Sequence, residues 1–319
     1  MRRAFVARLW QSLIVVAVVT AISFLLIHAA PGDPFSYENS RISIAQRDQL
    51  RAEAGYDKPL PEQFVRYTWR LLHGRFGYSF PHHAYVSELL AATIPRTLAL
   101  AGISLLLSFL LGMAVGVLQA ARRDGWFDRI SSSVLLVFYS LPDFWAALMA
   151  ALVFAQWWHL LPASGMTDPM HDYMPFWRAL GDRLSHFVLP CATLTLLTVA
   201  GIARYQRTAM LEVLPLDYVR VARAKGVPEK SIVWRHALRT ALAPMITLLG
   251  VLFPALLGGS VFVEKVFQWP GMGLLAVSGI ESRDYDVVTA TVIVGSLMVI
   301  AGNLIADLLH AALDPRVRA

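Results

Sequence analysis

Cysteine and charged residues are both scarce in this chain of 319 residues. It has one cysteine, and charged residues make up only 16% of it. Cys191 lies inside an apolar run, so no disulfide within the chain and no metal centre built from several thiolates can form. The nine histidines are scattered apart from the neighbours His82 and His83, and adjacent side chains do not share one helix face. These shortages favour loop histidines over a metal site.

Signatures of common catalytic and nucleotide-binding sites are also absent from the sequence. It contains no G-x-x-x-x-G-K-[ST] phosphate loop, no H-E-x-x-H zinc motif and no G-x-S-x-G around a serine nucleophile. We therefore expect that the chain is not an enzyme and does not bind ATP through a phosphate loop. If it moves a solute against a gradient, the energy has to come from a partner or from an ion.

Hydrophobic residues are abundant, at 56% of the chain, and they fall into long runs. A helix needs roughly 20 apolar residues to cross a bilayer, and each run is long enough. We expect an all-α polytopic membrane protein with six transmembrane helices and both termini in the cytoplasm. The first helix is expected within residues 1–30, and the others at about 97–118, 132–158, 187–205, 241–263 and 287–309. An extracytoplasmic loop region would cover residues 31–96 and a cytoplasmic tail residues 311–319.

The net charge of +6 does not indicate a nucleic-acid partner. The basic residues gather in short segments beside the apolar runs, as insertion into a membrane requires. At the N-terminus, Arg2, Arg3 and Arg8 precede an apolar run that also resembles a cleavable signal peptide. That run is long for a signal core, and Pro31 directly follows the small residues of the candidate cleavage site, which favours a retained span.

Three features stand out inside the predicted spans. Gly112 and Gly116 have small-xxx-small spacing, which indicates close helix packing and leaves a subunit interface open; glycines that are merely tolerated are an equally weighted alternative. Pro142 interrupts the third run and predicts a kinked span. Asp143 and Asp307 would be the carriers of an ion-coupled secondary transporter. For Asp143 we favour a carboxylate satisfied by freed backbone groups or placed near the interface, because its span contains no basic partner.

A polar, basic segment at residues 217–239 separates two of the apolar runs. Asp217 is expected to cap a short helix, and Gly226 to end that helix in the left-handed conformation. Pro228 would then start a second helix over residues 229–239. A short helix, a tight turn and a second helix between two spans form an element suited to being gripped by another protein.

The same segment resembles the coupling loop of permease subunits in binding-protein-dependent ABC importers. The stretch Tyr218-Val-Arg-Val-Ala-Arg-Ala-Lys-Gly226 is followed by His236-Ala-Leu-Arg239 and Pro244. Ala222 and Gly226 match the E-A-A, three residues, G pattern of the superfamily. Arg220 and Val221 stand at its first two positions, a departure that resembles the dipeptide and oligopeptide branch.

The resemblance to that branch runs nearly end to end. The stretches that carry it are Ala30 to Pro34, His73 to Ser79, Ile94 to Thr97, Leu161 to Gly165, Val266 to Gly273, Arg283 to Tyr285 and Leu313 to Arg318. Asp286 departs from the pattern, because the family often has proline there. The resemblance implies the type I ABC importer permease fold, an ABC transmembrane domain over residues 94–310 and a place in the bacterial inner membrane.

The resemblance also implies partners and a cargo. The partners would be a second homologous permease, two cytoplasmic ATPase subunits that bind the ATP, an extracytoplasmic solute-binding protein and membrane lipid, with no nucleic acid. The chain itself would hold no cofactor and no metal. The cargo would be peptides; glutathione, a nickel chelate or another small solute are alternatives within the same machinery. An ion-coupled transporter and a membrane-anchored scaffold remain as other classes, although no convincing internal repeat supports the former.

The resemblance assigns specific residues to the ATPase-coupling loop. They are Asp217, Tyr218, Arg220, Ala222, Arg223, Ala224, Lys225, Gly226 and His236. The two alanines would allow close approach to a partner groove, and the arginines and lysine would pair with acidic groups around it. A basic loop held at anionic lipid headgroups is the alternative. The substrate pathway stays unassigned, with Asn303, Ser296 and Thr247 as polar candidates for its lining.

Overall fold

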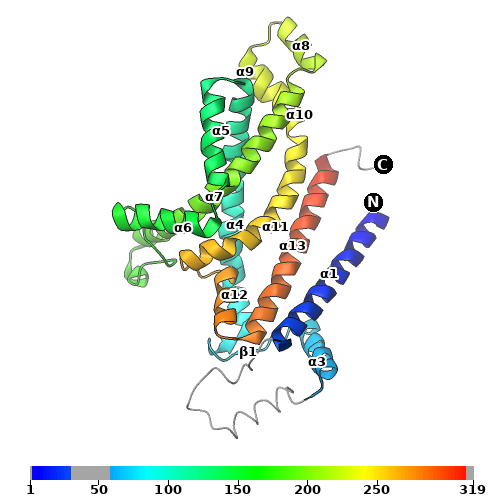
Figure 1. Cartoon of the computed structure of the whole chain (residues 1–319), viewed down its shortest axis with the longest axis vertical. Coiled ribbons are helices and arrows are strands. Elements are labelled where there is room, and N and C mark those ends of the chain that lie inside the picture. Colours follow the sequence, from blue (N-terminus) through cyan, green and yellow to red (C-terminus); the bar gives the residue numbers. More distant parts are fainter. Residues whose placement is uncertain (1, 30–57, 314–319) are drawn as a thin grey trace. The chain divides into compact units, whose positions relative to one another are not determined.

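The computed structural model describes residues 2–29 and 58–313, and this part of the chain is mostly helical (Figure 1). The longest helices are α1 (Arg2–Ala29), α4 (Val86–Ala121), α7 (Phe176–Val213), α11 (Ala243–Val266) and α13 (Tyr285–Leu313). Shorter α-helices are α3 (Leu60–Leu72), α5 (Trp126–Tyr139), α6 (Asp143–Ala150), α8 (Asp217–Ala224), α9 (Glu229–Ser231), α10 (Leu238–Ala241) and α12 (Met272–Glu281). The remaining elements are the π-helices η1 (Ala151–Trp157) and η3 (Ile232–Ala237), the 3₁₀ turn η2 (His171–Tyr173) and the strands β1 (Tyr78–Ser79) and β2 (Ala84–Tyr85).

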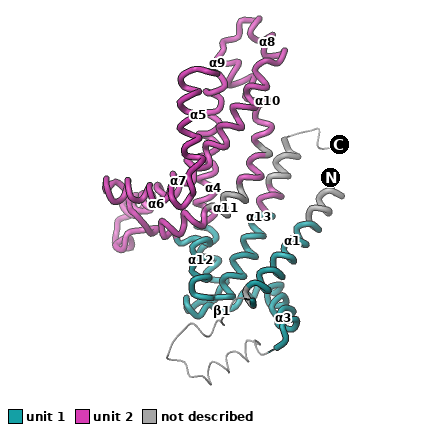
Figure 2. Tube along the Cα trace, viewed as in Figure 1, with its two compact units in different colours: residues 1–96, 270–300 teal, residues 97–269, 301–319 magenta. Residues whose placement is uncertain are grey.

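The chain divides into two compact units (Figure 2). Unit 1 comprises residues 1–96 and 270–300, and unit 2 comprises residues 97–269 and 301–319. In unit 1 the strands pair antiparallel, with Tyr78 opposite Tyr85. The core of unit 1 joins the first turns of α4 to α12 and to the start of α13, through Val86, Leu90, Met272, Leu275, Val287 and Ala290.

The polar contacts of unit 1 fasten the segment around β1 to the start of α13. The buried hydroxyl of Ser79 donates a hydrogen bond of 2.5 Å to Asp284, whose other carboxylate oxygen accepts the Val287 N–H. Gly77 has φ +95°, and a Cβ there would lie 2.0 Å from a carboxylate oxygen of Asp286. Asp286, the departure from the family pattern, therefore packs against a glycine.

Helix α3 lies within the region 31–96 that was expected to be a loop. It begins after Pro59 and carries Pro61 in its first turn, where the missing N–H removes no helical hydrogen bond. Phe64 and Tyr67 lie against Phe24 of α1, with ring centroids 5.2 and 5.7 Å apart. This part of the long loop region is thus folded onto the first helix.

Helices α4 and α7 pack closely inside unit 2. A Cβ at Gly112 would lie 2.7 Å from the Ile202 side chain, and one at Gly116 would lie 2.5 Å from the carbonyl oxygen of Ala203. The close-packing interpretation of the two glycines is therefore confirmed. The contact lies within one chain, however, whereas the sequence left a subunit interface open.

The third apolar run is broken, as Pro142 predicts, but the break is much sharper than a kink. The helices Trp126–Tyr139 and Asp143–Trp157 meet at 103°, so the segment is either a broken span or a re-entrant loop. Three helical segments are long and apolar enough to cross a membrane, namely Val86–Ala121, Phe176–Val213 and Tyr285–Ile305, and the bent pair is a fourth candidate. Within the described residues, α1 and α11 contribute the shorter apolar stretches Trp10–Leu26 and Ala243–Leu252.

The spans expected at about 241–263 and 287–309 leave residues 264–286 as a loop between them, and the structure corrects this expectation. Glu264 lies in the last turn of α11, is fully buried and accepts a hydrogen bond of 2.8 Å from Thr97. Met272 begins the ten-residue helix α12, so only two turns are left, one around the buried Trp269 and one at residues 282–284. A short apolar helix and a buried carboxylate depend on distant partners that sequence spacing does not identify.

Candidate coupling site and its supporting helices

Helix α8 begins at Asp217, one residue earlier than a cap at Asp217 implies. Leu216 occupies the N-cap position with extended backbone, and no side chain caps the helix. Asp217 is already helical, so the prediction that it caps the helix is wrong. Its carboxylate, 94% exposed, lies 3.6 Å from the guanidinium of Arg220. A negative charge in the first turn still stabilises the helix through its dipole.

The turn after α8 matches the expectation for Gly226, which has φ +76°. The Gly226 N–H bonds to the carbonyl of Arg223 at 2.9 Å, and the Val227 N–H to that of Ala222 at 3.2 Å. This pair of bonds is a Schellman motif, in which glycine avoids the cost of a Cβ in the left-handed region. The second helix then starts at Glu229, directly after Pro228, and runs through α9, η3 and α10. The helix predicted over residues 229–239 is therefore confirmed.

Ala222 lies inside the element rather than on its surface. It is 9% exposed and packs with the fully buried Val219 and Ile232, and Val227 covers the same cluster. The small side chain thus allows α8 to approach η3 of its own chain. The expectation that Ala222 approaches a partner groove is corrected, whereas Ala224 is exposed on α8.

Arg223 also has its partner within the chain. Its Nε and Nη2 donate to the two carboxylate oxygens of Glu229 at 3.1 and 2.7 Å, which ties α8 to α9 across the turn. The Tyr218 hydroxyl donates to the Thr240 hydroxyl at 2.9 Å and ties α8 to α10. Arg223 was expected to pair with acidic groups of a partner; within this chain its guanidinium is bonded to Glu229 and is 40% exposed. Arg220, Lys225 and His236 remain exposed.

The Arg223–Glu229 pair carries a pH prediction. Hydrogen bonds from Arg223 lower the pKa of Glu229 from its ordinary value of 4.5. The stabilisation is therefore fully present above that value and is lost as the pH falls through the lowered pKa of the folded state. Because the two side chains are 40% and 60% exposed, the pair contributes at most about 1 kcal/mol. We expect protease protection of the turn to be constant from neutral pH to about pH 5 and to weaken below it. Glu229→Gln should remove this dependence, and an unchanged acid profile in that variant would contradict the assignment.

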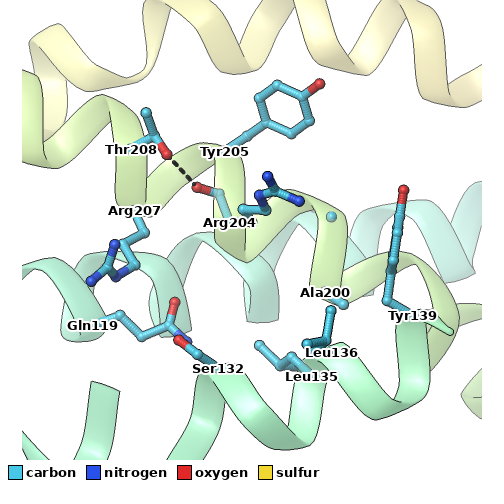
Figure 3. Close-up of a pocket in the computed structure, with 11 residues that line it drawn as sticks. Gln119, Ser132, Leu135, Leu136, Tyr139, Ala200, Arg204, Tyr205, Arg207 and Thr208 are labelled. Atoms are coloured by element: carbon cyan, nitrogen blue, oxygen red, sulfur yellow. Dashed lines mark hydrogen bonds between the residues drawn. The ribbon is translucent and has the colours of Figure 1, made fainter. Parts of the chain in front are cut away.

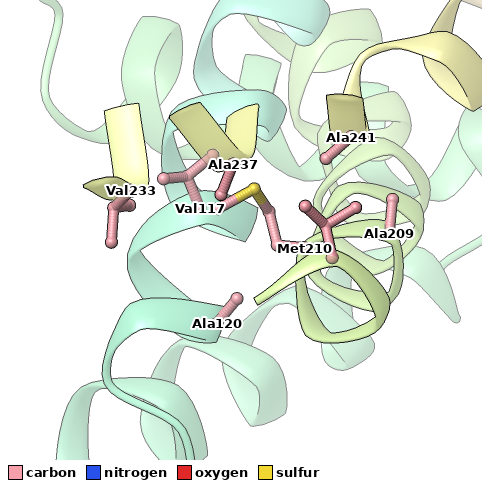
Figure 4. Packing of buried hydrophobic residues seen from close by; sticks show 8 residues of the cluster. Val117, Ala120, Ala209, Met210, Val233, Ala237 and Ala241 are labelled. Atoms are coloured by element: carbon pink, nitrogen blue, oxygen red, sulfur yellow. The ribbon is translucent and has the colours of Figure 1, made fainter. Parts of the chain in front are cut away.

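The second helix of the element rests on the ends of α4 and α7 (Figure 4). Val233, Ala237 and Ala241 supply its side of a buried apolar cluster. The other side consists of Val117 and Ala120 from α4 and Ala209, Met210 and Val213 from α7. Met210, Val117 and Ala237 are fully buried, so the helix has no room to slide over the two long helices. We call Val117, Ala120, Ala209, Met210, Val213, Val233, Ala237 and Ala241 the seat of the element.

A buried ion pair joins α5 to α7 near the seat. Arg207 donates from Nε and Nη2 to the two carboxylate oxygens of Asp128 at 2.8 and 2.7 Å. Asp128 also accepts the Asp124 N–H at 3.0 Å. The sequence does not predict this pair, because its partners are far apart along the chain. The only hint was an acidic residue beside several arginines at the start of an apolar run.

A cavity of about 690 Å³ lies between α5 and α7 beside this pair (Figure 3). It is lined by Gln119, Ser132, Leu135, Leu136, Tyr139, Ala200, Gly201, Arg204, Tyr205, Arg207 and Thr208. Gln119 donates to Ser131 and Ser132 at 2.9 and 3.2 Å. The cavity is therefore polar where these groups meet the arginines, and apolar around Leu135 and Ala200.

The polar candidates inside the apolar helices are distributed over both compact units. Asp143 is the first residue of α6, partly exposed, next to the N-terminal amides of that helix. The Ser296 hydroxyl donates to the Val292 carbonyl of its own helix, and Asn303 is exposed. The side chains of Thr247 and Asp307 lie outside the described residues.

A histidine cluster lies at the start of α7. His171 and His186 both contact the buried carboxylate of Asp182, at 2.7 and 3.2 Å, and Arg183 donates to the other ring nitrogen of His171 at 3.0 Å. These hydrogen bonds fasten η2 to α7. In the part of the chain that the structure describes, no group of three His, Cys, Asp or Glu residues is placed to hold a metal ion.

Comparison with known proteins identifies the family. Residues 108–319 match the family model described as "binding-protein-dependent transport system inner membrane component". Residues 1–101 match the model of the N-terminal part of such membrane components. The chain belongs to this family of transport permeases. The resemblance seen in the coupling segment is thereby confirmed.

Relatives of this permease cover its full length. The oligopeptide transport system permease protein AppB of Bacillus subtilis is 36% identical over 314 residues, which cover 98% of each chain. The glutathione transport system permease protein GsiC of Pectobacterium atrosepticum is 36% identical over 315 residues, again 98% of each chain. A chain from inward-facing structures of the MetNI methionine ABC transporter has a TM-score of 0.56 and 22% identity. That match covers 71% of this permease and 96% of the solved chain, which shows a shared fold.

Proposed function

We propose that this permease forms half of the translocation pathway of an ATP-driven importer. Its six predicted spans would place both termini in the cytoplasm and the chain in the bacterial inner membrane. The observation that carries the proposal is the construction of residues 217–241: a short helix is fastened to a second helix, and that helix is packed on two long apolar helices. A surface loop that only neutralised charge would need none of these contacts.

The proposed mechanism follows the contacts outward from α8. An ATPase subunit would grip the exposed side of α8, through Tyr218, Arg220, Ala224 and Lys225. Movement of α8 would pass to the second helix through the Val219–Ile232 packing. The seat would then carry it to α4 and α7, because close-packed apolar surfaces transmit displacement. Opening and closing of the pathway would follow the ATPase cycle, with the chemistry performed by the partner and not by this chain.

The remaining partners and the cargo are part of the same proposal. The family description names dependence on a binding protein, which supports an extracytoplasmic protein that delivers the cargo. A second permease subunit would complete the pathway, and two ATPase subunits would bind the ATP. The names of AppB and GsiC support peptides as cargo, with glutathione, itself a short peptide, as the alternative.

The test substitutes Gly226 in the complete transporter, reconstituted in vesicles with its binding protein. Gly226→Val places a branched side chain in the left-handed region, at a cost of roughly 1–2 kcal/mol or more, and should disturb the turn between the two helices. We expect ATP-driven uptake to fall at least ten-fold, and binding-protein stimulation of ATP hydrolysis to be lost with it. Membrane insertion should be unchanged.

Gly226→Asn is the matched control, because asparagine adopts positive φ readily and nothing within 4 Å obstructs a Cβ at this site. It should retain most of the uptake. Full stimulation and uptake in Gly226→Val would refute the coupling role. Uptake that follows an ion gradient without ATP would instead favour a secondary transporter.

A further inference from the structure

The cavity between α5 and α7 combines an unneutralised cation with an apolar wall. The guanidinium of Arg207 is engaged by Asp128, but that of Arg204 has no hydrogen bond or ion pair with any residue in the described ranges 2–29 and 58–313. None of the lining residues is acidic. The cavity therefore presents close to one net positive charge. Such a site favours a ligand with one negative charge and disfavours an ammonium group.

Polarity changes along the cavity in one direction. On α7 the arginines and Thr208 lie toward the C-terminal end of the helix, whereas Ala200 and Gly201 lie toward the middle (Figure 3). On α5, Ser132 lies at the middle of the helix, whereas Leu135 and Leu136 lie toward its C-terminal end. Because α5 and α7 run in opposite directions here, the two polar ends coincide, as do the two apolar ends. From Ala200 to Thr208 this gradient spans roughly 12 Å at 1.5 Å per residue.

The polar end coincides with the ends of the predicted spans. Arg204 lies at the end of the span expected at about 187–205, and Gln119 directly follows the span expected at 97–118. Leu136 and Tyr139, at the apolar end, are each 61% exposed, so the cavity opens at the surface of an apolar helix pair. The polar part therefore lies at headgroup depth and the apolar part at acyl-chain depth.

We propose that this cavity binds an anionic phospholipid. Its phosphate would contact Arg204, and the part of an acyl chain nearest the headgroup would lie along Leu135 and Leu136. The cavity volume of about 690 Å³ lies within the roughly 300–1,000 Å³ usual for sites that take small amphiphiles. The Thr208 hydroxyl donates its hydrogen to the Arg204 carbonyl, and its oxygen can still accept a hydrogen bond from a hydroxyl of a glycerol headgroup. Phosphatidylglycerol fits the single uncompensated charge. Phosphatidylethanolamine does not fit, because its ammonium finds no carboxylate in the lining.

A basic pocket between helices at the cytoplasmic face is a recognised setting for anionic lipid headgroups. Placement in that leaflet rests on the topology proposed above, whereas the binding itself does not.

The test measures which lipids stay bound to the full chain, purified with its co-purifying subunits from nanodiscs of equal phosphatidylglycerol and phosphatidylethanolamine. Native mass spectrometry should show retained phosphatidylglycerol in excess on the wild type. Arg204→Gln should reduce that excess roughly ten-fold, since it removes a charge-assisted contact. Arg204→Lys should keep part of the excess. Arg129→Gln is the matched control, because Arg129 is also an exposed arginine, at the start of α5, and does not line the cavity.

A second variant fills the cavity without changing its charge. A Cβ at Gly201 would meet only Tyr139, at 3.9 Å, so Gly201→Leu can project into the space without moving the backbone. It should displace the lipid as Arg204→Gln does, and it tests the site if Arg204→Gln does not fold. Equal retention of both lipids by the wild type, or an unchanged excess in Arg204→Gln and Gly201→Leu, would overturn the proposal. Displacement of the lipid by inorganic phosphate alone would show that the site recognises free anions, and would overturn the lipid assignment. Lipid retention is measured without any transport assay. A negative result would therefore reject the lipid site without rejecting the proposed coupling role.

Discussion

Gly116→Ala is expected to destabilise the permease by about 3 kcal/mol, the upper end of the roughly 1–3 kcal/mol usual for overpacking. The added Cβ would lie 2.5 Å from the carbonyl oxygen of Ala203 and 2.8 Å from the Cβ of Gln206. Neither obstacle is the tip of a flexible side chain, so α4 and α7 have to separate. Separation also loosens the seat, to which both helices contribute. The measurement is the midpoint of thermal unfolding in detergent, which should fall by several degrees.

Gly102→Ala is the matched control on the same helix. No atom lies within 4 Å of a Cβ at Gly102, so the substitution adds helix propensity without a clash. We expect an unchanged or slightly raised midpoint. If Gly116→Ala were equally neutral, Gly116 would be one of the tolerated glycines common in membrane helices, and the close contact between α4 and α7 would not limit stability.

Sequence patterns predict the local features of the fold but not the packing partners that separate a glycine such as Gly116 from one such as Gly102. Long apolar runs predict helices because a buried backbone has to bond internally, and Pro142 and Gly226 predict breaks because their own dihedral angles are restricted or unusually free. Those predictions are local, and the structure confirms the breaks. The 103° angle after Tyr139 and the helix α12 depend on packing partners far along the chain. No spacing rule supplies those partners.

In the candidate site, too, the sequence predicts local backbone features but not which side chains make contacts within the chain. Its position and the left-handed glycine follow from the sequence. The division between inward and outward side chains does not, since Ala222 and Ala224 have the same chemistry and differ only in which side of α8 meets Ile232. Arg223 and Arg220 are likewise indistinguishable until Glu229 is seen to lie across the turn. Only side chains that contacts within the chain leave exposed are available to a partner. The structure is needed to tell which side chains those are.

Asp128→Asn is expected to cost about 3 kcal/mol and Arg207→Met closer to 5 kcal/mol, within the range of about 3–5 kcal/mol for breaking a buried pair. The order follows from exposure: the Asp128 side chain is 4% exposed and that of Arg207 is 28% exposed, so an unpaired Arg207 regains more solvent. Removing both charges, as in Asp128→Leu with Arg207→Met, should restore much of the loss, because neither charge is then buried alone. A double-mutant cycle on the unfolding midpoints measures the coupling directly. Additive losses would show that the pair is screened and contributes little.

For Asp128→Asn, the same cycle makes opposite predictions for stability and for lipid retention. Asp128→Asn frees the Arg207 guanidinium, which lines the cavity beside Arg204, so the site gains a second unneutralised cation. Retention of phosphatidylglycerol should therefore rise while the unfolding midpoint falls. Arg207→Met lowers the midpoint and leaves the Asp128 carboxylate without its cation, so the net positive charge beside Arg204 decreases and retention should fall as well. A loss of retention that simply follows the loss of stability in both variants would mean that lipid binding reports only an intact fold. A rise in Asp128→Asn is the outcome that an electrostatic site requires and a general loosening of α5 and α7 does not produce.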